Sequence, residues 1–433
     1  MPFDPTVLVN DPDRRRIVLS MLGSALQAVD PAKAVGKALR LEGGKVVVAG
    51  KTFATSGVVV VAAGKAAPGM ARAVCAALSP LPVRGVVVSD HSEQVPVGLD
   101  HRLASHPIPD ERSVTAAREA VRLVEGAKPD ELVLFLISGG GSALLELPIG
   151  GLALDHLVAV QVLMLRGGVP IDEMNAVRRH LSGVKGGRLA AVCGSSMMAT
   201  LVMSDVSGRS PDVVASGPTL PDPSTFAEAR AVLQRHGLTH LIPPLVLQHL
   251  DDGIAGRVAE TPKADRPGHL VVVAADGKTA AHAACDAAKG HGLRATLITT
   301  TLSGEAREEA LKAVSTANSG AISVFAGETT VNVTGDGRGG RNQEAALAAS
   351  IALDGDPTVV FATCATDGVD GPTDAAGAIV DGGTSRRGLH SGLNAASHLS
   401  RNDSHGFLET TGDLLRTGPT GTNVGDIWLV WRG

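Results

Sequence analysis

Aromatic residues are scarce in this chain of 433 residues: Phe, Trp and Tyr together make up 2%, and Tyr is absent. Proteins that bind single-stranded nucleic acid stack the bases on aromatic side chains, so this composition removes their usual platform. An excess of positive charge is also missing, because 39 basic residues stand against 44 acidic ones and the net charge is −5. Nucleic acid is therefore not an expected partner.

Cysteine is equally rare, and the four residues are scattered singly. Without a CxxC pair or a Cys/His ligand spacing, the sequence indicates neither a disulfide framework nor a zinc site. Long apolar runs are missing too: no window of about 18 uninterrupted apolar residues occurs, and the N-terminus lacks a signal-peptide pattern. We expect a soluble, cytoplasmic protein without a membrane partner.

What the sequence does contain is a series of short runs rich in Val, Ile and Leu, each followed by a Gly, Ser or Asp turn. Most runs lack apolar/polar alternation, as strands buried on both faces do. Ala-rich helical segments follow several of them, and this alternation predicts doubly wound α/β sheets. The runs lie at 58–65, 85–91, 132–142, 200–208, 270–278, 295–300, 322–328, 359–368 and 427–431.

The chain is too long for one ordinary hydrophobic core, so two domains are expected. The rhythm of strands and helices breaks at the turn-forming groups IPP, DDG and KADRPG, which favour a domain boundary. We predict an N-terminal Rossmann-like α/β domain over 1–245, a linker over 246–266 and a C-terminal α/β domain over 267–433. A helical stretch at 152–193 precedes the boundary, with helix stops at its glycine pairs.

Three consecutive glycines follow the apolar run ELVLF, in the segment LISGGGSALL. Each ordered glycine loses more chain entropy than alanine would, so the triplet needs a reason: either a tight turn or a ligand that touches the backbone. Consecutive N–H groups that lead into a helix can bind an anion. We favour an anion site formed by Ser138, Gly139, Gly140, Gly141 and Ser142, with phosphate or carboxylate as the ligand.

Polar residues follow the other predicted strands as well. Ligands of open α/β sheets bind beyond the carboxyl ends of the strands, and Lys65, Asp90, His91 and Asp205 occupy such ends. The segment GKAAPGM around Lys65 has the glycine spacing of a P-loop but carries Met70 where Lys-Ser/Thr is required, so a P-loop assignment fails. An ammonium group at this position can still meet a phosphate.

A second glycine-rich turn, GDGRGGRNQE, occupies 335–344. Its glycines spell GxGxxG between VNVT and a helical segment, which taken alone is a weak signal of a dinucleotide fold. Arg338, Arg341, Asn342 and Gln343 also crowd the turn with hydrogen-bond donors, and an arginine can hold two phosphate oxygens at once. We favour a site that binds a polyanion over a dinucleotide-binding fold.

Acidic residues gather in the segment ATDGVDGPTDAAGAIVD, at the end of an apolar run. Asp367, Asp370 and Asp374 offer hard oxygen ligands along one loop, which suits an Mg²⁺ ion that bridges phosphates. The spacing is not that of an EF-hand, and aspartate is also an ordinary turn former. Further acidic candidates at strand edges are Asp205, Glu328 and Asp426.

With these motifs in view, the sequence resembles the glycerate 2-kinase family, also called class II glycerate kinases. The similarity spans almost the whole chain, and several long motifs in order are more specific than any one glycine pattern. The motifs are GKAA (64–67), SGGGSALL (138–145), NAVRRHLSGVKGGRLA (175–190), SDVSG (204–208), DPSTF (222–226), GGRNQE (339–344), TDGVDGPTDAAGA (366–378) and GPTGTNVGD (418–426).

The resemblance implies Mg²⁺-dependent transfer of the γ-phosphoryl group of ATP to the 2-hydroxyl of D-glycerate, in a cleft between two α/β domains. Lys65 and Arg341 would supply the cations that this transfer demands, and Asp367 or Asp374 a metal ligand or a base. The expected partners are D-glycerate and ATP, and a homodimer is a candidate assembly. The expected metal ligands are Asp205, Asp367 and Asp374, and the expected phosphate-binding residues of the second turn are Gly339, Gly340 and Asn342.

The helical motif NAVRRHLSGVKGG adds Asn175, Arg178 and Lys185 to the expected ligand-binding residues. Arg178 is a good partner for a substrate carboxylate through bidentate pairing. Arg179 points about 100° away on a helix, and we expect it to be solvated. For His180, we favour a polar-face residue over a catalytic base.

Two other functions stay open. A nicotinamide-dependent hydroxypyruvate reductase is suggested by the GxGxxG pattern and by a label that family relatives have carried, but it needs a ribose-binding acid about 20 residues on, and Asp367 lies further away. A non-catalytic nucleotide sensor would have the anion-binding turns without turnover, so it would keep nucleotide binding when Asp367 is replaced.

Overall fold

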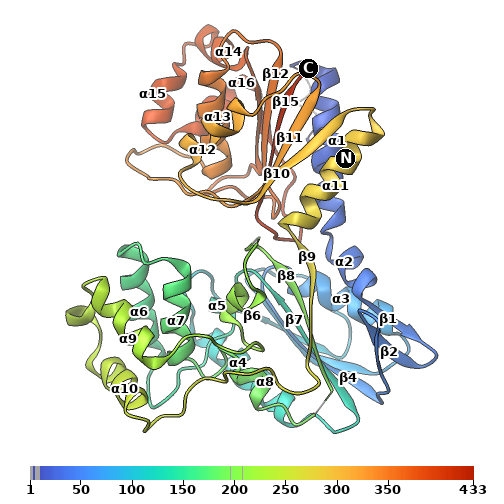
Figure 1. Cartoon of the computed structure of the whole chain (residues 1–433), viewed down its shortest axis with the longest axis vertical. Helices are drawn as coiled ribbons and strands as arrows, with labels where there is room; N and C mark the ends of the chain where they lie inside the picture. The colour runs from blue at the N-terminus through green and yellow to red at the C-terminus, as the bar shows by residue number, and fades with distance from the viewer. Residues whose placement is uncertain (1–2, 5–9, 196, 207) are drawn as a thin grey trace. The chain divides into compact units, whose positions relative to one another are not determined.

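The computed structural model describes residues 3–4, 10–195, 197–206 and 208–433. The chain divides into two compact units. Unit 1 comprises Met1–Lys33, Ser204–Gly208 and Ala275–Gly433, and unit 2 comprises Ala34–Met203 and Arg209–Ala274. Both units combine a six-stranded sheet with helices (Figure 1). The prediction of a two-domain α/β protein is confirmed.

The main sheet of unit 2 has the strand order β6-β5-β4-β7-β8-β9, which is 3-2-1-4-5-6 when its strands are numbered along the chain. This is the Rossmann order, and the pairs from β6 through β8 are parallel. Every residue of β4, β7 and β8 is buried, as their unbroken apolar runs predict. The strands are β4 (Gly57–Ala63), β5 (Val83–Ser89), β6 (Leu99–Leu103), β7 (Glu131–Ser138), β8 (Met198–Ser204) and β9 (Leu270–Asp276).

Helices of unit 2 serve two purposes. Some cross between the parallel strands, and α6, α7, α9 and α10 build a separate apolar cluster around Phe226, Val177 and Leu233. A small antiparallel sheet of β1 (Leu39–Glu42), β2 (Lys45–Val48) and β3 (Lys51–Phe53) completes the unit. The helices are α2 (Pro31–Ala38), α3 (Ala67–Leu78), α4 (Glu111–Glu125), α5 (Gly141–Leu144), α6 (Leu154–Arg166), α7 (Ile171–Leu181), α8 (Arg188–Ala191), α9 (Phe226–Arg235) and α10 (Pro244–Ile254), with 3₁₀ turns η2 (Pro211–Ser216) and η3 (Thr239–Leu241).

The sheet of unit 1 has the order β10-β11-β15-β12-β13-β14, and only the β10–β11 pair is parallel. Helices α1 and α11 cover one face, and α12, α13 and the α14–α16 group cover the other (Figure 1). The strands are β10 (Arg294–Leu302), β11 (Ala321–Gly327), β12 (Val359–Ala365), β13 (Gly377–Asp381), β14 (Leu414–Leu415) and β15 (Asp426–Arg432). The helices are α1 (Pro12–Ala28), α11 (Gly277–Gly290), α12 (Ala306–Ser315), α13 (Arg341–Ala352), α14 (Thr384–His390), α15 (Ala395–Ser400) and α16 (Ser404–Thr411).

The boundaries of the units differ from the predicted ones. Helix α1 belongs to unit 1 rather than to an N-terminal domain, because the fully buried Arg15 forms ion pairs with Asp381 and Asp413. The predicted linker at 246–266 begins inside α10, whose Val246 and Leu250 are fully buried in the helical cluster of unit 2. Among the helices that the structure describes, none has the length and apolar character of a membrane span.

Candidate active site

The turns after β4 and β7 meet in unit 2, at the point where the strand order reverses. A side chain on Gly64 would place its Cβ 2.1 Å from Ser138 Oγ. The Lys65 N–H donates to the Gly139 carbonyl at 2.9 Å, and the Ala66 N–H donates to Ser138 Oγ at 3.1 Å. This reversal point is where doubly wound sheets bind ligands.

The glycine triplet has a steric reason within this turn. Gly140 has φ +86° and caps the short helix α5, and a Cβ on Gly141 would lie 2.7 Å from the Cβ of Ala215. Ser138 is fully buried, and its hydroxyl is used by the neighbouring turn. The tight-turn interpretation is therefore supported by contacts, and an anion at Gly139 to Gly141 stays a prediction.

A strained loop packs against the triplet. Ala215 and Ser216 have φ values of +52° and +58°, a left-handed conformation that costs non-glycine residues free energy. The Ser216 hydroxyl contacts Ser142 Oγ at 2.8 Å and donates to Asn175 Oδ1 at 2.8 Å. Asn175, which we expected to contact a ligand, is buried and holds this loop. No sequence pattern identified Ala215 or Ser216.

Arg178 on α7 is largely buried, and within the described residues its guanidinium forms no salt bridge. Its Nη1 lies 3.5 Å from Asn175 Oδ1, and its buried Nε has no hydrogen-bond partner. Burial lowers the pKa of Arg178, an effect that the carboxylate of Glu146 opposes. A buried cation without a direct counter-ion is costly, so this position suits an anionic ligand.

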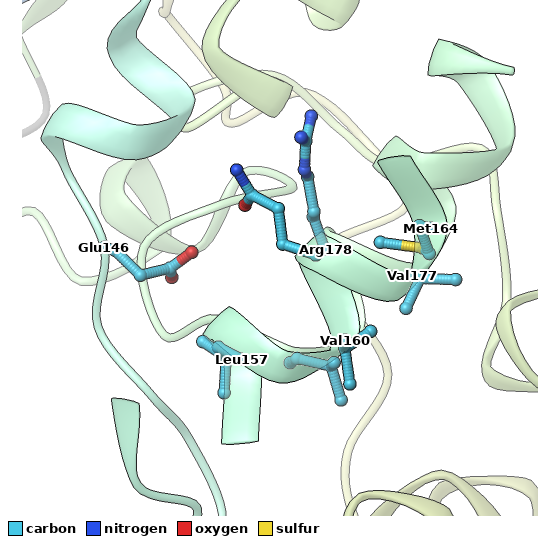
Figure 2. Close-up of a pocket in the computed structure, with 8 residues that line it drawn as sticks. Glu146, Leu157, Val160, Met164, Val177 and Arg178 are labelled. Atoms are coloured by element: carbon cyan, nitrogen blue, oxygen red, sulfur yellow. The ribbon is translucent and has the colours of Figure 1, made fainter. Parts of the chain in front are cut away.

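Arg178 and Glu146 line a cavity together with the apolar residues of α6 and α7 (Figure 2). The enclosed space is small, about 10 Å³, which is room for about one water molecule. Its wall is mainly apolar, and Glu146, Gln161 and Arg178 supply the polar groups. The lining residues are Glu146, Leu157, Val160, Gln161, Met164, Val177, Arg178 and Leu181.

We expected Lys185 to contact a ligand, but the structure buries its side chain. It is 1% exposed, and its ammonium donates to Glu146 Oε2 at 2.7 Å and to the Leu145 carbonyl at 3.2 Å. Burial lowers its pKa, against the attraction of Glu146. The geometry therefore gives Lys185 an internal role, which is to hold the Glu146 carboxylate at the cavity.

The predictions for the residues beside Arg178 have mixed outcomes. Arg179 was expected in solvent but is 4% exposed, because its guanidinium pairs with Asp212 at 2.7 Å and Asp222 at 3.0 Å. His180 is fully buried, with its ring nitrogens 2.7 Å from the Ala176 carbonyl and 3.1 Å from Glu260 Oε1. Both residues hold the helical cluster rather than facing a ligand.

His106 joins the turns at the reversal point, although no sequence pattern singled it out. It lies in the loop between β6 and α4. A Cβ on Gly140 would be 3.5 Å from His106 Cδ2 and 3.5 Å from Lys65 Cγ, so the imidazole and the Lys65 side chain flank the same glycine. The site therefore draws on three loops that are far apart in the sequence.

Unit 1 holds a second cluster, centred on Arg341 at the start of α13. Its guanidinium binds Asp426 in bidentate fashion, at 2.6 and 2.9 Å, and lies 3.1 Å from Glu328 Oε1. Burial raises the pKa of Glu328 to about 7; Arg341 opposes the rise, whereas Asp426, Asp205 and Asp367 add to it. Asp426 thus occupies the fork that we expected to hold phosphate oxygens.

The backbone donors of the GGRNQE turn are also used by other residues of the protein. The first N–H groups of α13, from Asn342 and Gln343, donate to the Asp370 carboxylate at 3.0 and 2.9 Å. Gly339 and Gly340 leave no room for side chains, because Ser404 and Asp370 pack against them. Asp370, Asn342 and both glycines therefore build the fold here, and the predicted polyanion site has no free N–H groups at these two positions.

The three expected metal ligands do not lie in one group. The charges of Asp205 and Asp367 both raise the pKa of Glu328. Asp374 instead pairs with His405 at 3.0 Å and Arg416 at 2.9 Å, and these hydrogen bonds lower its pKa. In the described part of the chain, no three His, Cys, Asp or Glu residues converge as a ready metal site. Carboxylates beside Glu328 fit the oxygen chemistry of Mg²⁺, which needs only one or two protein ligands besides water and phosphate.

Comparisons with known proteins agree with this architecture. A family model described as a domain of unknown function (DUF4147) matches residues 17–251, and a model of the MOFRL family matches 321–426. The chain is 39% identical to a glycerate 2-kinase of Pyrococcus horikoshii, covering 96% of each chain. It is also 39% identical to an Agrobacterium vitis protein that carries the provisional name hydroxypyruvate reductase, covering 98% of this chain and 96% of the relative.

A solved structure, that of a glycerate kinase from Thermotoga maritima, superposes with a TM-score of 0.85 at 36% identity. The match covers 97% of this chain and 99% of that one. Since close relatives match over nearly their full length, and both the motif order and the fold agree, the chain belongs to the glycerate 2-kinase family.

Proposed function

We propose that the protein transfers the γ-phosphoryl group of ATP to the 2-hydroxyl of D-glycerate, giving 2-phospho-D-glycerate and ADP. The observation that carries this proposal is Arg178, a largely buried guanidinium without a salt bridge among the described residues, which lines a small pocket beside the apolar residues of α6 and α7. The name of the Pyrococcus horikoshii relative, glycerate 2-kinase, supports this reaction, and the Thermotoga maritima structure carries the coarser name glycerate kinase.

The carboxylate of glycerate supplies what Arg178 lacks. A guanidinium presents parallel N–H groups that match the two oxygens of a carboxylate. Glu146 cannot fill this role, because its oxygens accept from Lys185 Nζ and from the Leu147 N–H. A bound glycerate would therefore neutralise Arg178 and place its hydroxyl near the reversal point of the sheet.

Lys65 and the SGGGS turn are the proposed phosphate-binding groups of unit 2. Phosphoryl transfer has a loose transition state, so positioning and cationic stabilisation do most of the catalytic work. Lys65 is held by its backbone at the turn, which fixes the base of its side chain. Ser142 and the glycine N–H groups would complete this contact.

In unit 1, Asp205 and Asp367 are the proposed carboxylates for Mg²⁺, and Arg341, which keeps its pairs with Asp426 and Glu328, is the proposed cation beside them. An Mg²⁺ ion bound with ATP neutralises charge on the phosphates. Asp374 is left out of this set, since its carboxylate is engaged by His405 and Arg416. Glu328, with its raised pKa, is the further acid at this position.

The reductase alternative lacks its structural context. A dinucleotide fingerprint follows a strand directly and opens a helix, but β11 ends at Gly327, eight residues before Gly335. Within the described range 328–340, no extended strand precedes the turn. Gly335 and Gly337 instead pack against Arg401 and Asp403.

Purified protein given D-glycerate, ATP and Mg²⁺ is expected to release ADP only when all three are present. The matched control contains hydroxypyruvate and NADH without ATP. Oxidation of NADH together with no glycerate-dependent ADP release would reject the kinase in favour of the reductase.

A further inference from the structure

His106 is an exposed histidine beside the proposed acceptor site, and neither its ring nor its loop has a role so far. Its ring edge, Cδ2 and Nε2, would lie 3.5 and 3.7 Å from a Cβ on Gly140. In the described chain, neither ring nitrogen of His106 has a hydrogen-bond partner. A neutral ring nitrogen at this place is therefore available to a ligand.

The loop that carries His106 is fixed to the cavity wall. The next residue, Pro107, accepts a hydrogen bond from Gln161 Nε2 through its carbonyl at 2.6 Å. Gln161 lines the same cavity as Arg178 and Glu146. The backbone next to His106 is thus held at the site at which we place the glycerate carboxylate.

The charges around His106 favour its neutral form. Burial lowers its pKa, Lys65 and Arg178 lower it further, and only Asp90 opposes them. The Asp90 carboxylate lies 2.8 Å from His91 Nδ1, at the surface. A histidine whose pKa lies below the ordinary value of about 6.5 is mostly an unprotonated base at neutral pH.

We propose that His106 is the general base of the reaction, a role that rests on the proposed function. With its carboxylate on Arg178, a bound glycerate would direct its 2-hydroxyl toward the turn at Gly140, beside which His106 lies. One ring nitrogen takes the hydroxyl proton as the oxygen forms its bond to the γ-phosphorus and the bond from that phosphorus to ADP breaks. The proton then leaves the imidazolium to water, which restores the neutral ring.

The other polar groups at this edge are less suited to the task. Lys65 and Arg178 are needed as cations. Ser138 is fully buried and hydrogen-bonded to the neighbouring turn. His106 is the described side chain here that combines a ring nitrogen without a hydrogen-bond partner with a place beside Gly140, which the Lys65 side chain also flanks.

The test compares wild-type protein with the H106N and H106Q variants and with H240N, a control in which an exposed histidine of the same unit is changed. We expect kcat to fall about 10²- to 10⁴-fold in both His106 variants, with unchanged ATP binding and thermal unfolding. H240N should match the wild type. In the wild type, kcat/KM should rise with pH through a pKa below that of free imidazole, and this limb should vanish in H106Q.

A third variant, H106A, tests the chemistry directly. Added imidazole should restore part of its kcat, because the free base can occupy the space left by the ring. Turnover of H106N within threefold of wild type, or a loss that leaves the pH limb intact and is not rescued, would overturn the role of His106 while the kinase stands. A wild type without glycerate-dependent ADP release would overturn both.

Discussion

Arg178 and Arg179 are neighbours on one helix with opposite surroundings. Arg179 is enclosed by two carboxylates, Asp212 and Asp222, whereas Arg178 has no salt bridge within the described chain and faces a cavity. Helix geometry predicts that the two side chains diverge by about 100°, but it does not say which of them faces solvent. The positions of Asp212 and Asp222, more than 30 residues away, decide that question.

Replacing Arg178 by Met should raise the KM for D-glycerate about 10- to 100-fold, because charged hydrogen bonds to the carboxylate are lost. Stability should change little, since no ion pair is broken. Steady-state kinetics with glycerate as the varied substrate measure the effect, and an unchanged KM would remove Arg178 from the site.

Replacing Arg179 by Met should instead destabilise unit 2 by about 3 to 5 kcal/mol, since it leaves Asp222 buried without its partner. Urea unfolding followed by circular dichroism measures this loss. If R179M unfolds at the wild-type midpoint and R178M does not, the two assignments are reversed.

At the scale of elements, the strands that form unbroken apolar runs could be predicted, and the strands of other composition could not. The runs that became β4, β7 and β12 are fully buried. Strand β6, with the sequence LDHRL, is mostly exposed and gives no apolar signal. Strand β13 lies inside the Gly- and Asp-rich segment that we interpreted as a loop.

The close approach of the turns after β4 and β7 predicts that Gly64 cannot be replaced by a larger residue. Gly64→Ala should destabilise unit 2 by about 2 kcal/mol or more and reduce turnover, because φ is +129° and the new Cβ would overlap Ser138. Gly36→Ala is the matched control: it lies exposed in α2 with nothing within 4 Å of the new Cβ, so it should be neutral or stabilise by up to about 1 kcal/mol. Thermal unfolding of both variants is the measurement, and an equal effect would refute the steric argument.

At the scale of the whole molecule, the sequence predicts two α/β domains and the edge of the sheet where we place the candidate site, but not the true composition of each unit. Helix α1 joins the C-terminal residues through Arg15, and its partners Asp381 and Asp413 are more than 360 residues away. Long-range ion pairs leave no local pattern. For the same reason, the sequence did not predict that Arg341 pairs with Asp426, or that His106 lies beside Lys65.

This ion-pair cluster predicts acid sensitivity of unit 1. Burial alone would raise the pKa of Asp381, but hydrogen bonds from Arg387 and Arg15 lower it to about 2. A lowered pKa contributes stability above the unfolded value of 3.8, and this contribution, about 2 kcal/mol, is lost as the pH falls from about 4 toward 2. Across this pH range, the free energy of unfolding should fall less steeply in the Asp381→Asn variant than in the wild type. An equally steep fall in both proteins would contradict this role of Asp381.

The most direct measurement identifies the carbon that receives the phosphoryl group. Wild-type protein is incubated with D-glycerate, ATP and Mg²⁺, and the product is examined by proton-coupled phosphorus NMR. Phosphate on carbon 2 couples to one proton and gives a doublet, which is the predicted result. A triplet, from phosphate on carbon 3, or no phosphoglycerate at all, would contradict the assignment of this protein as a glycerate 2-kinase.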